Sequence, residues 1–178
     1  MLVDLHTHSA PKSYDAYQTS EELIIEASGL GIDSICLTEH DIFWSRDEAM
    51  SITRNGKIVV LFGCEINTDQ GHFLAFGLSK YVFGMHKLSF LRRQIDKVGG
   101  ALIAAHPYRN RKHSEISSPL SNPDNRKNSS DYLRYCEAIE SSNGRGSQEE
   151  NEFSRRIAAN RLIPCTGGSD SHGPGDIG

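Results

Sequence analysis

The chain has few cysteines, no long hydrophobic run and no excess of positive charge. Its four cysteines lie far apart in apolar segments and form no CxxC pair. We therefore expect buried, reduced thiols rather than disulfides or a thiolate zinc site. The longest apolar runs, such as IVVLF, fall far short of the roughly 20 residues that a membrane helix needs, and the sequence does not open with a signal-peptide pattern. These absences predict a soluble, cytoplasmic protein that does not enter a membrane.

The charge balance excludes a general attraction to nucleic acid. The 178 residues include 19 basic and 23 acidic side chains, for a formal net charge of -4. A mildly acidic chain does not attract a phosphate backbone over its whole surface. We expect no extended nucleic-acid surface and only local recognition of phosphate. The length fits a single domain, residues 1–178, with a core of its own.

Apolar, strand-like runs alternate with helix-like stretches along most of the chain. Strands are predicted at 1–6, 32–40, 57–66, 71–78, 101–107, 136–141 and 162–172. Helices are predicted at 19–31, 44–56, 86–98 and 147–161, the first of them opening on a Thr or Ser cap. This alternation predicts βαβ units and a mainly parallel sheet, and seven strands indicate an α/β barrel.

Two segments depart from this regular pattern. The stretch at about 107–130 is rich in Ser, Asn, Pro and basic residues, and so long a polar loop is typical of a functional lid or an insertion. The last predicted strand is followed by no closing helix. We expect either an incomplete barrel or a chain truncated at its C-terminal end.

Histidines and acids recur at the predicted strand ends. In VDLHTHSA, His6 and His8 are two residues apart, so an extended chain presents both imidazoles to the same point. The other histidines of this pattern are His40, His72, His106 and His172, and the acids are Glu39, Asp41, Glu65 and Asp170. The C-terminal strand ends of a parallel barrel meet on one face, where we expect these side chains to converge.

A cluster of imidazoles and carboxylates without cysteine is typical of a site for zinc, manganese or iron. The ligands are too numerous for one ion. A carboxylate such as Glu65 can bridge two ions roughly 3.5–4 Å apart, which stabilises the attacking and leaving oxygens of a displacement. The pattern therefore favours phosphoester chemistry.

Five segments, in this order, resemble the motifs of the polymerase and histidinol phosphatase (PHP) superfamily of metal-dependent phosphoesterases. They are DLHTHS, TEHD, GCEIN, AAHPYR and GSDSH, and they span His6 to His172. The resemblance implies a distorted seven-stranded (β/α)7 barrel, similar to a TIM barrel. It also implies two to three divalent transition metal ions at the C-terminal strand ends.

The resemblance further implies three sets of metal ligands. The first set is His6, His8, Glu65 and Asp170. Glu65 would bridge to a second set completed by His72 and His106, and the third set is Asp15, His40 and His172. Glu39 and Asp41 flank His40 in the sequence, and Glu140 lies at a predicted strand end. We expect these three acids to support ligands or structure rather than to bind metal.

The implied reaction is hydrolysis of a small phosphate ester by metal-bound hydroxide. We expect catalytic roles for Glu65, Asp170 and His172. A guanidinium matches the geometry of phosphate, so Arg109 in HPYR is the first candidate for substrate binding and Arg145 in NGRG the second.

Other functions also fit these residues. A metal-dependent amidohydrolase likewise begins with HxH at its first strand, although here Glu65 stands where those barrels usually carry a bridging lysine. A regulatory or metal-binding PHP domain without turnover is a further alternative. The substrate stays open among histidinol phosphate, nucleotides with 3′- or 5′-phosphates, and other small esters.

Overall fold

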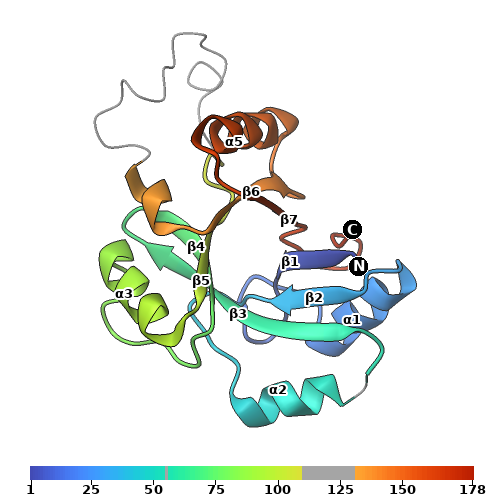
Figure 1. The fold of residues 1–178 in the computed structure, drawn as a ribbon. Coiled ribbons are helices and arrows are strands. Elements are labelled where there is room, and N and C mark those ends of the chain that lie inside the picture. Colours follow the sequence, from blue (N-terminus) through green and yellow to red (C-terminus); the bar gives the residue numbers. More distant parts are fainter. Residues whose placement is uncertain (55, 110–130) are drawn as a thin grey trace.

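The computed structural model describes residues 1–54, 56–109 and 131–178. Its centre is one seven-stranded sheet whose strands follow each other in chain order (Figure 1). The strands are β1 (Val3–Thr7), β2 (Ser34–Leu37), β3 (Val59–Thr68), β4 (Gly71–Phe76), β5 (Ala101–Ala104), β6 (Ala138–Asn143) and β7 (Cys165–Gly168). The α/β class and the seven predicted strands are therefore confirmed.

The helices lie around the outside of this sheet (Figure 1). They are α1 (Ser20–Gly29), α2 (Arg46–Thr53), α3 (Leu88–Val98) and α5 (Gln148–Arg161), with a short 3-10 helix, η2, at Asp131–Tyr135. Capping boxes begin three of them, with Thr19, Ser45 and Ser147 as the N-cap residues. In each box the cap side chain accepts a backbone N–H, and a glutamate three residues later accepts the N–H of the cap. The helix starts are thus encoded locally.

The sheet curls until its two edges nearly meet. Just beyond β7, the N–H of Asp170 donates to the carbonyl of His6 at 2.8 Å. The N–H of His8 donates to the carbonyl of Ser171 at 3.0 Å. These bonds join the end of β1 to the segment after β7, so the sheet forms an almost closed barrel whose site residues can converge.

One strand runs against the others. β4 pairs antiparallel with both β3 and β5, whereas the remaining neighbours pair in parallel. The sheet is mainly parallel, as predicted, but this reversal was not part of the prediction. It follows from the tight connection between β3 and β4, which is too short for a parallel crossover. The start of β4 therefore lies at the barrel end where most other strands finish.

Apolar residues pack in the layers between the sheet and its helices. Leu88, Leu91 and Ile95 of α3 belong to one buried cluster with Phe73 of β4 and Leu102 of β5. A second cluster joins α1 to β2. Burial of such side chains contributes about 1.5–3 kcal/mol each, so these layers hold the strands that carry the site.

The cysteines only partly match their predicted environment. All four are free, and Cys36 and Cys64 are buried. Burial raises the pKa of the Cys36 thiol to about 12. Cys136 is half-buried, but Cys165 is exposed, so the prediction of burial is wrong for Cys165. Cys165 is the first residue of β7, and none of the four residues of this strand is fully buried.

Most of the predicted lid at 107–130 lies outside the described residues, which stop at 109 and resume at 131. Within the described ranges, no helix combines the length and the hydrophobicity required to cross a membrane.

Gly168 on β7 packs closely against His6 of β1 and Glu140 of β6, so the position leaves little room for a side chain. A Cβ at this position would approach Glu140 Oε1 and the backbone nitrogen of His6 at 2.9 Å each. We predict that Gly168→Ala lowers the free energy of unfolding by about 1–3 kcal/mol because strand backbone must shift. Urea denaturation measures this change.

Gly167 provides the matched control for this prediction. A Cβ at Gly167 meets only Ser142 atoms, at 3.4 and 3.5 Å, which are ordinary contacts. Gly167→Ala should therefore change stability by less than Gly168→Ala. Equal effects of the two substitutions would contradict the packing argument.

Candidate metal centre

The carboxylate of Glu65 is at the centre of the polar cluster. Its side chain is 1% exposed, and its two oxygens face different groups of histidines. Oε1 lies 2.9 Å from His72 Nδ1 and 2.8 Å from His106 Nε2. Oε2 lies 3.0 Å from His40 Nδ1, 3.3 Å from His8 Nε2 and 3.4 Å from His6 Nε2. Glu65 thus contacts five of the six histidines expected at strand ends.

Backbone pairing explains why Glu65 and His72 meet. In the antiparallel ladder Glu65 pairs with Leu74, and His72 is two residues earlier on β4. Alternate residues of a strand share a face, so His72 and Leu74 lie on the same side of the sheet as Glu65. The reversal of β4 therefore brings the first residues of this strand into the site, whereas a parallel strand would carry them to the opposite end.

The HxH pair presents both imidazoles to one point, as its two-residue spacing predicts. The Nε2 atoms of His6 and His8 are 3.0 Å apart. Nδ1 of His6 lies 3.0 Å from Oε1 of Glu140, a carboxylate that accepts the ring N–H and leaves Nε2 to face the cluster. Oδ1 of Asp170 lies 3.5 Å from His6 Nε2 and 3.4 Å from His8 Nε2. Together with Glu65, which also contacts both imidazoles, four of the expected ligand side chains therefore converge here.

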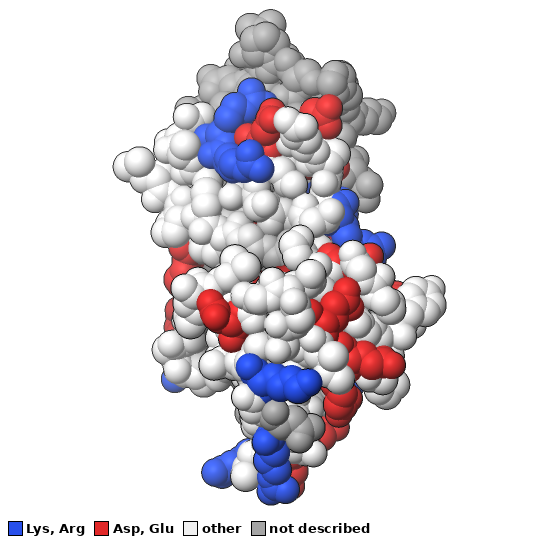
Figure 2. Space-filling view, turned by 90° about the vertical axis from the view of Figure 1, so that its right-hand side faces the viewer, with Lys and Arg blue, Asp and Glu red and all other residues white. Residues whose placement is uncertain are grey.

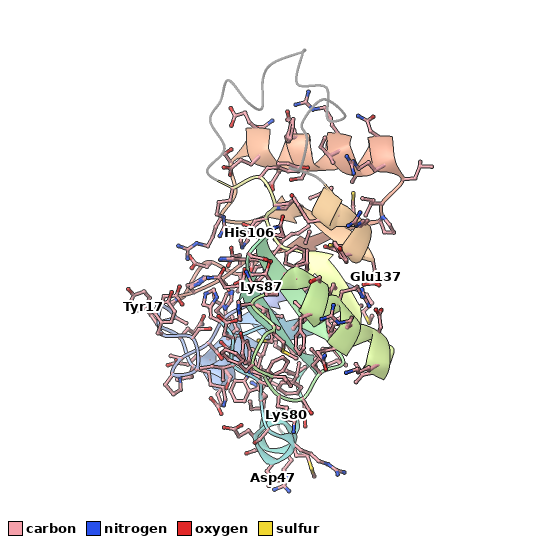
Figure 3. The ribbon with its side chains drawn as sticks, turned by 90° about the vertical axis from the view of Figure 1, so that its left-hand side faces the viewer. Tyr17, Asp47, Lys80, Lys87, His106 and Glu137 are labelled. Carbon is pink, nitrogen blue, oxygen red and sulfur yellow. The ribbon has the colours of Figure 1, made fainter. Side chains whose placement is uncertain are left out.

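The remaining expected ligands form an adjoining group. Oδ2 of Asp15 lies 3.2 Å from His172 Nε2 and 3.4 Å from His40 Nε2. The rings of His8 and His40 stack with centroids 4.2 Å apart. Nδ1 of His172 donates to the backbone carbonyl of Asp170 at 2.8 Å, so its Nε2 is available on the side of Asp15. Figure 3 shows this end of the barrel, with His106 and Tyr17 labelled.

Three groups of ligand atoms are close enough to hold ions, with all atoms in a group within 4.8 Å of one another. They are His8, His40 and His172; His6, His8 and Asp170; and His6, Glu65 and His106. The groups share His6 and His8, so they form one continuous cluster rather than separate sites. This continuity is what a site for several ions requires.

The electrostatics of the cluster favour bound positive charge. Burial alone would lower the pKa of His6, but the charges of Glu140 and Glu65 raise it well above its usual value. Burial alone would raise the pKa of Glu65, but His6 and the neighbouring histidines hold it well below its usual range. Asp170 has a lowered pKa for the same reason, with Arg109 adding to the effect of the histidines. The buried carboxylates thus remain anionic.

Several buried polar atoms of the cluster residues have no hydrogen-bond partner in the described chain. They include Glu65 Oε2, Asp15 Oδ1 and His40 Nε2. Such atoms are costly to bury unless something compensates them. Carboxylate and imidazole donors without a thiolate fit zinc, manganese or iron. The residues present therefore fit divalent transition metal ions.

The family model for the PHP domain matches residues 4–159, and that for the PHP-associated region matches residues 148–178. The chain belongs to the PHP domain family. Among curated proteins, it is 36% identical over 64 residues to an error-prone DNA polymerase of Nocardia farcinica (strain IFM 10152). That match covers 36% of this PHP domain and 6% of the polymerase, so the chain spans only a small part of that relative.

Solved structures share the fold at low sequence identity. A Bifidobacterium adolescentis protein assigned by prediction to the metal-dependent phosphoesterases is 17% identical, with a TM-score of 0.72 over 97% of this chain and 88% of that one. An amidohydrolase from Chromobacterium violaceum, solved with sulfate and no metal, is 18% identical, with a TM-score of 0.71 over 100% and 90%. A two-domain Bacteroides vulgatus protein containing a predicted PHP-like metal-dependent phosphoesterase is 22% identical, with a TM-score of 0.66 over 97% and 52%.

The two predicted substrate-binding arginines occupy different environments in this PHP domain. Nη2 of Arg109 contacts Oδ2 of Asp170 and lies 2.6 Å from Oδ1 of Asn143, while its buried Nε has no hydrogen-bond partner in the described chain. Arg145 is exposed, and its backbone N–H donates to the same Asn143 oxygen at 3.0 Å. Arg109 is therefore at the site, and Arg145 is at its edge.

A cavity of about 290 Å³ opens beside the cluster. Its lining includes His72, His106, Arg109, Gln70 and Tyr132. Two expected ligands and the arginine thus face the same space. The volume approaches the lower end of the range for small-molecule pockets, about 300–1,000 Å³.

The acids that were expected to play supporting roles do so in different ways. Glu140 holds His6 and also accepts the backbone N–H of His106 at 2.7 Å. Glu39 is fully buried beneath the loop after β1. Asp41 accepts the N–H of Asn67 at 3.2 Å, which ties the end of β2 to β3.

Sequence reasoning missed Asn143 and Ser13. The amide of Asn143 donates to Glu140 Oε2 at 3.0 Å and to Asp170 Oδ2 at 3.3 Å, so it joins two carboxylates that repel each other. Strict alternation would place Asn143 on the face opposite Glu140. The register of β6 with β7 shifts by one residue between Glu140 and Ser142, and this bulge turns Asn143 back to the site. Ser13 carries no motif signal.

We predict that Glu65→Gln removes more than one metal ion per chain from this PHP domain. The substitution preserves size but removes the charge that both groups of histidines face, whereas loss of an ordinary ligand should affect one ion. Elemental analysis of protein purified without chelator measures the metal content, which should exceed one ion per chain in the unsubstituted protein.

Glu149→Gln, in the first turn of α5, is the matched control and should retain all metal. Full metal content in Glu65→Gln would show that Glu65 does not hold two ions. A metal-free unsubstituted protein would contradict the multinuclear interpretation itself.

Proposed function

We propose that this PHP domain is a metal-dependent phosphoesterase that hydrolyses a small phosphate ester. The observation that carries the proposal is that the two carboxylate oxygens of Glu65 face different groups of histidines. Oε1 faces His72 and His106, while Oε2 faces the histidines of β1 and β2. A buried carboxylate that serves two separate ligand groups is suited to bridge two cations.

The ligand sets of the proposal follow this division. The first ion would be held by His6, His8, Glu65 and Asp170. The second ion would be held by Glu65, His72 and His106. The third ion would be held by Asp15, His40 and His172. Zinc, manganese and iron all suit these donors.

When bound, divalent cations activate water near neutral pH and neutralise the charge of a phosphoryl group. The chain's own residues orient the reactants. Glu65, Asp170 and His172 would act as catalytic residues through the cations, because each belongs to one of the proposed ligand sets. Burial and the neighbouring His8 lower the pKa of His172, which keeps its imidazole neutral and able to coordinate.

The substrate side of the site favours a small ester. The cavity beside His72 and His106 is of small-molecule size and contains Arg109. The buried Nε of this guanidinium has no hydrogen-bond partner in the described chain, and we infer that it donates to a phosphate oxygen when a substrate binds. On the face shown in Figure 2, opposite to that of Figure 3, acidic and basic side chains both occur amid a mostly uncharged surface. The polymerase match is too short to extend that protein's activity to this chain.

A screen for phosphate release tests the proposal. The purified chain, supplied with Mn, Zn or Fe, is incubated with histidinol phosphate, with 3′- and 5′-nucleotides and with simple phosphomonoesters. Turnover of at least one ester, abolished by chelator and restored by metal, is the expected result. Amide substrates serve as the opposing arm, and turnover of amides without phosphate release would favour an amidohydrolase. Metal binding with no turnover in either arm would favour a regulatory domain.

We predict that Arg109→Lys weakens substrate or transition-state binding by about 1–3 kcal/mol, because the lysine retains the charge but loses the two-pronged donor geometry. Metal content should stay the same, since positive charge remains beside Asp170. Steady-state kinetics and inhibition by free phosphate measure the effect.

Arg145→Lys is the control for this prediction, and its kinetics should match the unsubstituted protein. If Arg109→Lys leaves both kinetics and phosphate inhibition unchanged while Arg145→Lys alters them, then Arg145 is the phosphate-binding residue. In that case the role of Arg109 is limited to its contact with Asp170.

A further inference from the structure

Glu39 is a buried carboxylate that none of the close ligand groups includes. It is 0% exposed, and within the described residues the hydrogen bonds to its carboxylate come from two serines of the loop after β1. The N–H of Ser9 donates to Oε2 at 3.0 Å, and the Ser9 hydroxyl donates to Oε1 at 2.5 Å. The hydroxyl of Ser13 donates to Oε2 at 2.5 Å. Through these three hydrogen bonds, the carboxylate of Glu39 holds the loop after β1 in place.

The hydroxyl of Ser13 also reaches the metal cluster. Its oxygen lies 3.1 Å from Nδ1 of His8 and 3.4 Å from the backbone nitrogen of His40. A hydroxyl has one proton to donate and two lone pairs that accept. The proton is committed to Glu39, because a carboxylate can only accept. The N–H of His40 can only donate, so the remaining lone pair of Ser13 accepts from Nδ1–H of His8.

This assignment fixes the tautomer of His8. With the proton on Nδ1, the lone pair of Nε2 points at the cluster, where Glu65 Oε2 lies 3.3 Å away and Asp170 Oδ1 lies 3.4 Å away. His6 and His172 are oriented in the same way by direct acceptors, the carboxylate of Glu140 and the carbonyl of Asp170. For His8, a hydroxyl stands between the ring and the buried carboxylate.

We propose that Ser13 is a positioning residue that holds His8 in the Nδ1-protonated tautomer. Because its hydroxyl proton is donated to Glu39, its oxygen can only accept a hydrogen bond from the ring. The Nε2 lone pair is then directed at the cation in advance. The inference rests on the proposed function only in treating His8 as a metal ligand. Partners of this kind typically contribute a factor of roughly 10–100 to metal affinity.

Ser13→Ala tests the proposal, with Ser9→Ala as its matched control. Both substitutions remove one hydroxyl from Glu39, but only Ser13 touches His8. The tautomer is read in the metal-free protein from the ¹⁵N chemical shifts of the His8 ring, and affinity is measured by titration with Zn²⁺ alone. Neither measurement needs a substrate, so failure of the phosphatase assay leaves this test intact.

We predict one tautomer, protonated at Nδ1, in the unsubstituted protein and in Ser9→Ala. In Ser13→Ala the His8 ring should show mixed tautomers, and Zn²⁺ affinity should fall by roughly 10- to 100-fold. Ser13→Thr, which retains a hydroxyl, should restore both. Circular dichroism verifies folding, and if Ser13→Ala does not fold, Ser13→Cys replaces it, because a thiol is a weak hydrogen-bonding group of similar shape.

Two results would overturn the proposal. One is an unchanged His8 tautomer with the same Zn²⁺ affinity in Ser13→Ala and Ser9→Ala, which would reduce Ser13 to a loop anchor. The other is an Nε2-protonated His8 in the unsubstituted protein.

Discussion

The burial of the Glu65 carboxylate among histidines is the interaction on which the rest of this structure depends. Glu65 is almost fully buried and is held from β1, β2, β4 and the end of β5. A carboxylate in such a place needs compensating positive charge. The barrel brings its strand ends together around this one group. The strand arrangement that defines the fold therefore also sets the positions of the site residues.

A second layer of polar groups orients the ring of histidines. Glu140 holds His6, and Glu39 holds His8 through Ser13. The Glu140 carboxylate and the Ser13 oxygen each accept the outward N–H of an imidazole and leave the inward nitrogen as a lone pair, which is the arrangement that metal coordination requires. The buried acids at the edge of the cluster would therefore act on a bound cation through the tautomers of the histidines, without touching it.

Arg109 links the cation-binding cluster to the space where a substrate would lie. Its Nη2 contacts Asp170 on one side, while the cavity that it lines also includes His72 and His106. A guanidinium in this position balances the charge of the carboxylates and offers donors of phosphate geometry in one place. Membership of the PHP domain family and the geometry of the cluster agree on a metal-dependent site, and the identity of the substrate depends on the loops around the cavity.

The sequence by itself determined what depends on local pattern. Helix starts followed from their capping boxes, strands from apolar runs, and the pairing of His6 with His8 from the two-residue repeat of an extended chain. Only the tertiary structure decided what depends on register between distant segments. The reversal of β4 brings His72 to Glu65, and the bulge in β6 turns Asn143 toward Asp170. The fold of the loop after β1 sets Ser13 between Glu39 and His8. No local pattern encodes these three contacts, because each is fixed by the pairing and packing of residues far apart in the chain.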